Sequence, residues 1–353
     1  METSPEDHIL DYAGSFRLLR KVADGGMATV YEAEQLGPAG FAKRVALKVI
    51  HPQYASERHW LQLFIDEAKL SANLAHGNIV QIYQLGEVDG QYYMAMEYIQ
   101  GPTLRSIIDR HAELHQAMPL PIAAYIASRV CRALDYAHNF VAPGGQRLDV
   151  VHRDVSPGNI MASWDGHIKL ADFGIAKART SFDPAAERHI LMGKKHYMSP
   201  EQALALAVDA RSDVFTLGVV LYEMLTLEPL FKEDITDLLL DEVTVHPLPS
   251  VRARVPQLPG EIEEILTRAL ARDPNRRPTA AAMGHALDRW IERQRPVATP
   301  DRLQEHLATI FPTALKRISG SSAKAETPTK FSNFKRGLRR PRKPGLLSRL
   351  FGL

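Results

Sequence analysis

The chain has 353 residues, of which 45% are apolar and 24% are charged, and this composition excludes a fully disordered chain because there is enough apolar surface to build a core. Cys131 is the only cysteine, so an intrachain disulfide scaffold is also excluded. The formal net charge of +2 hides an asymmetry, since residues 316–353 carry eleven Lys or Arg and one acid, while the preceding residues are mildly acidic.

Membrane-spanning and secreted proteins are not expected either. The most apolar stretch, residues 215–225, is much shorter than the ~20 residues that a spanning helix needs. The acidic N-terminal sequence METSPEDHIL lacks the basic and apolar regions of a secretory signal. We therefore expect a cytoplasmic protein, with two globular units or one large unit plus extensions.

The N-terminal part of the chain is predicted to form mostly strands, over residues 16–99, with a short apolar strand at 45–50. The Asp89-Gly90 dipeptide lies between two strand-like segments. This is a strong hairpin signal, because the dipeptide tolerates the positive φ of a type I′ turn. One helix, at about 59–74, is expected to interrupt the strands.

The pattern becomes helical after residue 101. Residues 121–139 place apolar side chains at helical spacing, and residues 213–226 are apolar nearly all round, so the latter helix should be central to a large core. Further predicted features are a second hairpin at Asp165-Gly166 and helices at 260–272, 279–294 and 301–311.

The expected organisation is an α+β fold with flanking extensions. Residues 1–15 form an N-terminal extension, and a strand-rich unit (about 16–99) is joined by a hinge near 98–102 to a helical unit (about 100–294). A C-terminal extension, residues 295–353, begins with one short helix. It continues as a basic segment rich in Ser, Lys, Arg and Pro, a composition typical of disorder.

Two motifs that can carry chemistry flank the second hairpin: VHRDVSPGN at 151–159 and ADFG at 171–174. Because a hairpin brings its two ends together, Asp154, Asn159 and Asp172 should converge. Two carboxylates and an amide oxygen suit Mg²⁺, which takes its remaining ligands from water and phosphates. A single Asp in such a place is more often a turn residue or a helix cap, but the two motifs in this order favour a metal site.

With these motifs, the segments VALK (45–48) and SPE (199–201) and a late Arg277 occur in a familiar order, so residues 16–294 resemble a bacterial, Hanks-type serine/threonine protein kinase. The resemblance implies a two-lobed fold with a small β-rich N-lobe and a larger, mostly helical C-lobe. It also implies ATP and Mg²⁺ as cofactors and transfer of the γ-phosphoryl group to Ser or Thr hydroxyls of proteins, with autophosphorylation.

The resemblance also implies catalytic roles for particular residues. Asp154 would accept or steer the proton of the substrate hydroxyl, and Asn159 and Asp172 would hold the metal ions. Lys48 would contact the α- and β-phosphates, and Glu67 would be its partner on the predicted helix. Charge and alignment matter most here, because phosphoryl transfer needs little covalent help from the protein.

A nucleotide pocket follows from the same resemblance, with Val30 and Ala46 as its roof, Met161 as its floor and Met96 as gatekeeper. Each of these side chains could equally be a core residue, and both interpretations can hold because nucleotide pockets are largely apolar. The residues expected to bind nucleotide are Val22, Gly25, Gly26, Val30, Ala46, Lys48, Met96, Glu97, Ile99 and Met161.

The Gly-rich loop departs from the family form G-x-G-x-x-G-x-V, because Ala23 and Ala28 stand in place of the first and third glycines. Gly25, the central one, is kept, and it is the glycine that most needs bare backbone to approach phosphate. The loop is therefore still expected to cover the phosphates.

A paired departure concerns the lysine that most Ser/Thr kinases carry two residues after the catalytic Asp. Ser156 occupies that position here, and Lys194 stands where the family has Thr after Gly193. Our hypothesis is that Lys194 places its ammonium where the missing lysine would lie, so that the γ-phosphate keeps a cation. The alternative is an exposed Lys194 and a catalytic loop without that charge.

The sequence also suggests residues that support the catalytic loop and hydroxyls whose phosphorylation could regulate the protein. Glu201 should form a buried ion pair with Arg277, and Asp213 should bond to the catalytic-loop backbone at 152–153. The hydroxyls between the DFG motif and Gly193 belong to Thr180 and Ser181. Either could be autophosphorylated, an acid such as Glu187 could substitute, or loop phosphorylation could be dispensable.

The basic tail places six cations within residues 335–343 and ends in the apolar LLSRLFGL. It could bind an anionic membrane surface at the inner face of the membrane, an acidic protein partner, or nucleic acid by charge alone, or it could be simply solvated; specific nucleic-acid binding is not expected. For the whole chain, the alternatives to a protein kinase are a pseudokinase scaffold, which Lys48, Glu67 and Asp154 argue against, and a small-molecule kinase of related fold.

Overall fold

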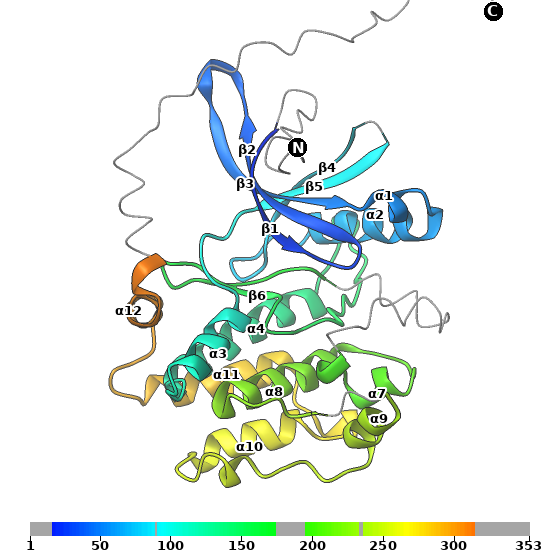
Figure 1. The fold of residues 1–353 in the computed structure, drawn as a ribbon. Helices are drawn as coiled ribbons and strands as arrows, with labels where there is room; N and C mark the ends of the chain where they lie inside the picture. The colour runs from blue at the N-terminus through cyan, green and yellow to red at the C-terminus, as the bar shows by residue number, and fades with distance from the viewer. Residues whose placement is uncertain (1–15, 89, 174–194, 233–235, 315–353) are drawn as a thin grey trace, which may run out of the picture. The chain divides into compact units, whose positions relative to one another are not determined.

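A computed structural model describes residues 16–88, 90–173, 195–232 and 236–314. The chain divides into two units, residues 1–312 and 313–353. Within the first unit, a lobe built on a β-sheet (the sheet lobe, residues 16–99) precedes a lobe built of helices (the helical lobe, residues 100–312), and the hinge (residues 98–102) connects them (Figure 1).

The sheet lobe contains a five-stranded antiparallel sheet in the order β1-β2-β3-β5-β4. Side chains alternate along β3, so that Val45 and Leu47 face one apolar cluster while Ala46 and Ile50 face another. Helix α2 covers the second face. The elements are β1 (Phe16–Asp24), β2 (Ala28–Leu36), β3 (Ala42–Ile50), α1 (Pro52–Ala55), α2 (Arg58–Ala72), β4 (Ile82–Val88) and β5 (Gln91–Glu97).

The helical lobe surrounds α8, whose side chains from Ser212 to Leu225 are all buried, as the apolar pattern predicts. A short hairpin, β6–β7, is added to the helices at the side of the hinge. The elements are α3 (Leu104–Glu113), α4 (Leu120–His138), β6 (Ile160–Ala162), β7 (Ile168–Leu170), α7 (Pro200–Ala203), α8 (Ala210–Thr226), α9 (Thr236–Thr244), α10 (Gly260–Ala269), α11 (Ala280–Glu292) and α12 (Pro300–Ile310).

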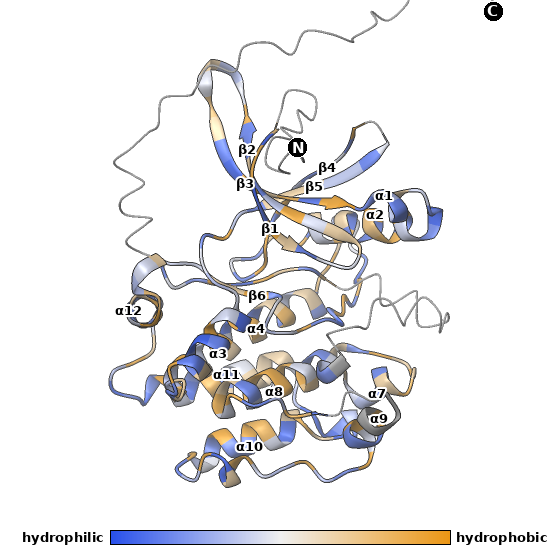
Figure 2. Cartoon of the chain, in the orientation of Figure 1, coloured by the Kyte–Doolittle hydropathy of each residue, from blue (hydrophilic) through white to orange (hydrophobic). Residues whose placement is uncertain are grey.

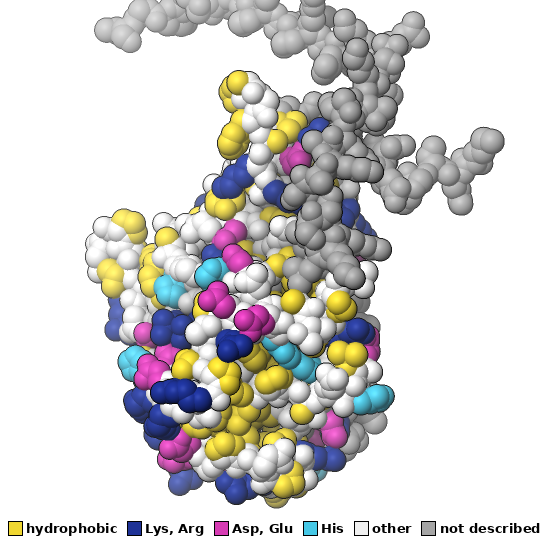
Figure 3. Space-filling model, turned by 90° about the vertical axis from the view of Figure 1, so that its left-hand side faces the viewer, with side chains coloured by type: hydrophobic (Ala, Val, Ile, Leu, Met, Phe, Trp, Pro, Cys, Tyr) yellow, Lys and Arg dark blue, Asp and Glu magenta, His cyan; other side chains and the backbone are white. Residues whose placement is uncertain are grey.

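The apolar residues of the helical lobe lie where its helices pack against one another. Apolar residues line the inner faces of α4, α8 and α11, which pack together in one core (Figure 2). On the face shown in Figure 3, hydrophobic side chains gather in the lower half, over the helical lobe, with charged side chains spread around them. None of the described helices is long and apolar enough to cross a membrane.

The predicted elements agree with those observed. Gly90, between β4 and β5, has φ +79°, and Gly166, between β6 and β7, has φ +83°, so both turns use the conformation that glycine tolerates. The α+β, two-lobed fold is confirmed. An irregular loop at 139–149, closed by a bridge between Val141 and Arg147, was not predicted, because it lacks any regular hydrophobic period.

Candidate functional site

The β6–β7 hairpin brings three of the predicted site residues together. The Ala171 backbone N–H donates to the Asn159 carbonyl at 2.8 Å, which closes the base of the hairpin and places Asp172 beside it. Asn159 Nδ2 donates to the Asp154 backbone carbonyl at 2.8 Å and to its Oδ2 at 2.9 Å. The expected convergence of Asp154, Asn159 and Asp172 is therefore present.

Lys48 connects this hairpin to the sheet lobe. From β3, its Nζ donates to Glu67 Oε1 on α2 at 2.9 Å and to Asp172 Oδ1 at 3.0 Å. The side chains of Lys48 and Glu67 are 15% and 12% exposed. The choice of Glu67 over the adjacent Asp66 agrees with this geometry, since Asp66 instead accepts from Gln62 Nε2.

The charges of this triad are set by burial and by one another. Burial alone would lower the pKa of Lys48, but the carboxylates of Asp172 and Glu67 raise it above its usual value, so the ammonium is charged. Burial raises the pKa of Glu67, while Lys48 opposes that shift. A cation is thus held between two carboxylates, one from each lobe.

Asp213, at the start of α8, holds the loop that carries Asp154. Its carboxylate accepts the backbone N–H groups of His152 and Arg153, each at 2.8 Å, and His138 Nε2 lies 2.8 Å from Oδ2. The left-handed backbone of Arg153 (φ +63°) and Asp172 (φ +55°) is uncommon for residues other than glycine. The predicted bond from Asp213 to the loop backbone is confirmed.

The predicted pair of Glu201 and Arg277 is also confirmed. Arg277 Nη1 and Nη2 donate to the two carboxylate oxygens of Glu201 at 2.6 and 2.9 Å. The Arg277 side chain is fully buried and that of Glu201 is 7% exposed. The guanidinium also lies over the ring of Phe215 at 4.8 Å, so this pair joins α7 to the core of the helical lobe.

Most of the residues expected around the nucleotide base share one apolar cluster. Its members from the predicted set are Val30, Ala46, Met96, Ile99 and Met161. Met161 comes from β6 and the others from the sheet lobe and hinge, so the cluster spans both lobes. Val22 is outside it and 42% exposed. The Glu97 carboxylate accepts from Lys169 Nζ at 2.9 Å, and the Glu97 N–H donates to the Gln81 carbonyl; the backbone hydrogen bonds expected from residues 97–99 to the nucleotide stay a prediction.

The Gly-rich loop between β1 and β2 is short and tightly closed. The Gly25 N–H donates to the Ala28 carbonyl at 2.9 Å, and a Cβ at residue 25 would lie 3.2 Å from that oxygen. A Cβ at Gly26 would meet nothing within 4 Å. Close approach of backbone therefore explains Gly25 but not Gly26.

Two supporting networks were missed from the sequence. Thr29 Oγ1 donates to Asp24 Oδ1 at 2.7 Å and lies 2.9 Å from His51 Nε2, which ties the Gly-rich loop to the end of β3. In the helical lobe, the buried Glu223 of α8 accepts from Arg105 at 2.8 Å and from the Tyr197 hydroxyl at 2.5 Å. A Glu within an apolar helix was the available signal, because a buried carboxylate needs partners.

Ser156 is buried, and its Oγ has no hydrogen-bond partner among the described residues. The residue proposed to compensate for it, Lys194, lies outside the described residues, as do Thr180, Ser181 and Glu187.

The oxygen atoms present fit a divalent metal. The Asp172 carboxylate, 38% exposed, and the Asn159 amide oxygen are hard ligands of the kind that Mg²⁺ prefers. Because Asn159 Nδ2 faces Asp154, the amide oxygen is the atom that a metal could use. Two protein ligands suffice where phosphates and waters supply the others.

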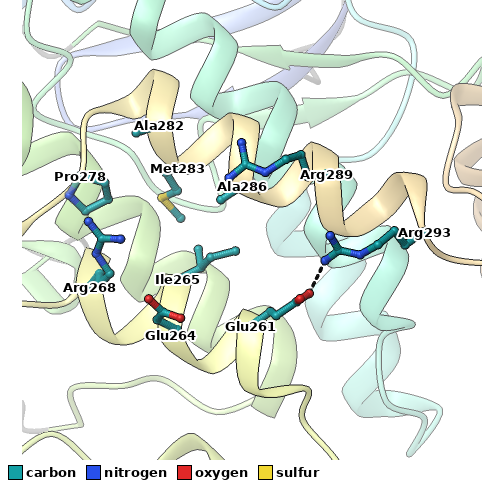
Figure 4. A pocket seen from close by; sticks show the side chains of 10 residues that line it. All are labelled: Glu261, Glu264, Ile265, Arg268, Pro278, Ala282, Met283, Ala286, Arg289 and Arg293. Atoms are coloured by element: carbon teal, nitrogen blue, oxygen red, sulfur yellow. Dashed lines mark hydrogen bonds and ion pairs between the residues drawn. The ribbon is translucent and has the colours of Figure 1, made fainter.

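Helices α10 and α11 line a separate, partly open pocket of about 340 Å³ (Figure 4). Its walls mix apolar residues such as Ile265 and Met283 with charged ones, including the ion pair of Arg293 and Glu261. It shares no residue with the cluster around Lys48 and Asp172, and its lining holds no acid or amide near the hairpin, so we do not assign the chemistry to it.

Comparison with known proteins agrees with this geometry. The family described as "Protein kinase domain" matches residues 16–289. Tyrosine-protein kinase MasK of Myxococcus xanthus is 39% identical over 284 residues, covering 80% of this chain and 44% of that protein. Serine/threonine-protein kinase PrkC of Bacillus subtilis is 32% identical over 343 residues, covering 95% and 50%.

A solved structure gives the same result for the fold. The PknI kinase domain of Mycobacterium tuberculosis superimposes with a TM-score of 0.59 at 26% identity, covering 82% of this chain and 99% of that domain. The chain spans about half the length of the curated relatives it matches.

Proposed function

Because the chain belongs to the protein kinase family, with bacterial Hanks-type serine/threonine kinases among its relatives, we propose that it transfers the γ-phosphoryl group of ATP to Ser or Thr hydroxyls of proteins and phosphorylates itself. The observation that carries the proposal is the contact of Lys48 with both Glu67 and Asp172, beside the Asp154–Asn159 pair.

Lys48 would place positive charge at the α- and β-phosphates. Its ammonium is held charged between two carboxylates and is fixed by β3 and α2, so little reorganisation is needed when the nucleotide binds. Negative charge accumulates on the transferring oxygens in the transition state, and a fixed positive charge stabilises it. This stabilisation is largest in a site that excludes water, because the low dielectric strengthens the interaction.

Asp154 would orient the substrate hydroxyl and accept its proton. Its Oδ2 receives the hydrogen bond from Asn159, which fixes the carboxylate while Asp213 fixes the loop backbone. General base assistance of this kind contributes about 10²–10⁴-fold. When bound, Mg²⁺ at Asn159 and Asp172 would supply charge neutralisation and alignment of the phosphates.

The decisive experiment is an autophosphorylation assay with labelled ATP that compares the wild type with Asp154→Asn. Loss of labelling in the variant, with ATP binding retained, supports the assignment. Equal labelling of both proteins would refute Asp154 as the base. No labelling of the wild type or of any offered protein, despite ATP binding, would favour the pseudokinase scaffold.

The identity of the phosphorylated hydroxyl needs its own measurement. A relative that is 39% identical is named a tyrosine-protein kinase, and Ser156 removes the lysine typical of Ser/Thr kinases. Phosphoamino-acid analysis of the labelled protein separates the two. Phosphoserine or phosphothreonine is the expected result, and phosphotyrosine alone would overturn the proposed specificity.

For the γ-phosphate we retain the proposal that Lys194 replaces the missing lysine. It is supported by the small, buried Ser156, whose Oγ has no partner among the described residues. Lys194→Ala should then reduce turnover about 10²–10³-fold, as removal of one transition-state donor does, with little change in ATP affinity. A near-normal rate would sink this proposal.

The partners that we propose are protein substrates and, for the basic tail, an anionic membrane surface or an acidic protein. The protein would then be cytoplasmic, with the tail at the inner face of the membrane. Six cations within residues 335–343 support this, at about 1 kcal/mol per cation near the surface. Sedimentation with vesicles containing anionic lipid tests it, and equal binding to neutral vesicles would contradict it.

A further inference from the structure

Helix α12 lies beyond residue 289, where the match to the kinase family ends. Leu303, Leu307 and Ile310 on this helix are at most 2% exposed and belong to the core of the helical lobe. Their spacing puts them on one face. The helix is therefore part of the folded kinase unit.

Both ends of α12 contact the turn of the β6–β7 hairpin. At its first residue, the Pro300 carbonyl oxygen lies so close to Gly166 that a Cβ at residue 166 would come within 1.9 Å of it. Just after its last residue, the ring of Phe311 packs edge-on against Trp164, with centroids 5.9 Å apart. The turn is thus held from two points.

The same turn is bonded to the hinge and is continuous with the candidate metal ligands. The Trp164 N–H donates to the Gln100 carbonyl at 2.9 Å. The two strands that leave the turn have only three residues each; Asn159 directly precedes β6, and only Ala171 separates β7 from Asp172. A displacement of the turn would therefore be transmitted to both ligands through a short, rigid ribbon.

Helix α12 also contacts α3, the helix that begins just after the hinge segment. Arg110 Nε donates to the Ile310 carbonyl at 2.9 Å. His111 and His306 stack at 5.0 Å, with their Nε2 atoms 2.9 Å apart. Consequently α12 connects three parts of the site's support: α3, the hinge through Trp164, and the hairpin.

We propose that α12 is a positioning element of the active site: by holding the β6–β7 turn against the hinge, it keeps Asn159 and Asp172 in the geometry that metal and nucleotide require. The inference rests on the proposed kinase function. Phe311 and Trp164 are positioning residues in this arrangement and touch neither metal nor nucleotide themselves.

The test uses the full chain with Phe311→Ala, Phe311→Tyr as the conservative variant, and Gln304→Ala as a control on an exposed position of the same helix. ATP binding is measured by calorimetry at several Mg²⁺ concentrations, which needs no turnover, alongside the autophosphorylation rate. Phe311→Ala should raise the Mg²⁺ concentration for half-maximal ATP binding about 3- to 10-fold, below the 10- to 100-fold effect of direct outer-shell ligands.

Phe311→Tyr and Gln304→Ala should behave as the wild type. A double mutant of Trp164→Ala and Phe311→Ala should show no more than the larger single effect, because the two rings form one contact. If Phe311→Ala lowers thermal stability while its Mg²⁺ titration overlays that of the wild type, the helix has only a structural role and the proposal is overturned. If the wild type binds Mg²⁺ and ATP but transfers no phosphate, the proposed function fails, and the binding titration still decides the role of α12.

Discussion

Arg277→Ala should destabilise the protein more than most single substitutions can. The guanidinium has five N–H donors, and five hydrogen bonds are present: two to Glu201 and one each to the carbonyls of Ala271, Arg211 and Arg272. Truncation leaves three carbonyls and a buried carboxylate without this partner. Removing one member of a buried ion pair costs about 3–5 kcal/mol.

That cost corresponds to a fall in Tm of roughly 6–20 °C, at about 2–4 °C per kcal/mol for a unit of this size. Differential scanning calorimetry measures it directly. Arg277→Lys should recover little, because an ammonium cannot reproduce the planar fork. Arg293→Ala is the matched control, since its pair with Glu261 is exposed on both sides and such pairs contribute below about 1 kcal/mol.

The pH dependence provides a second check on the same pair. Burial would raise the pKa of Glu201, but hydrogen bonds from Arg277 and Ser212 lower it below the usual 4.5. The stabilisation is therefore present above pH 4.5 and is lost as the pH falls through the lower, folded-state pKa. The difference between wild type and Arg277→Ala should shrink in acid. A loss in Tm no larger than that of Arg293→Ala would refute the reasoning.

Three further predictions concern the site and its support. Lys48→Met should slow phosphoryl transfer about 10²–10³-fold in a steady-state assay, and an unchanged rate would remove Lys48 from the mechanism. Asp213→Asn gives up one of the acceptor sites that hold the catalytic loop, so the urea midpoint should fall by an amount equivalent to about 1–3 kcal/mol; an unaltered midpoint would contradict that role. Burial and the neighbouring His111 lower the pKa of His306 to about 4, so its contribution is present above the unfolded value near 6.5 and is lost as the pH falls toward 4. In His306→Gln, the urea midpoint of unfolding should depend less on pH between 6.5 and 4 than it does in the wild type. A pH dependence equal to that of the wild type would argue against this assignment.

Sequence patterns were sufficient where the determining contacts are local. The hairpin that joins the HRD and DFG segments closes within a few residues around Gly166, so the convergence of Asp154, Asn159 and Asp172 follows from chain order. The buried helix α8 was predictable for a similar reason, because an apolar surface all round a helix can only be accommodated in a core.

Resemblance to a family supplied what local pattern could not. Lys48, Glu67 and Asp172 are far apart in the sequence, and no periodicity connects them. Their roles were inferred from the order of motifs, and the geometry brings the three side chains together. The same holds for Glu201 and Arg277, which are 76 residues apart.

The sequence by itself determined the strand-rich and helical parts of the chain, six of the helices and the two glycine turns, and by resemblance which side chains could serve phosphoryl transfer; helices α1, α3, α7 and α9 were not predicted individually. Only the tertiary structure decided what each apolar face packs against. The spacing of Leu303, Leu307 and Ile310 is consistent with an amphipathic helix but does not say where that helix docks, because hydrophobic burial is not directional. The contacts of Phe311 with Trp164 and of His306 with His111 exist because the packed core brings segments that are distant in sequence close together in space.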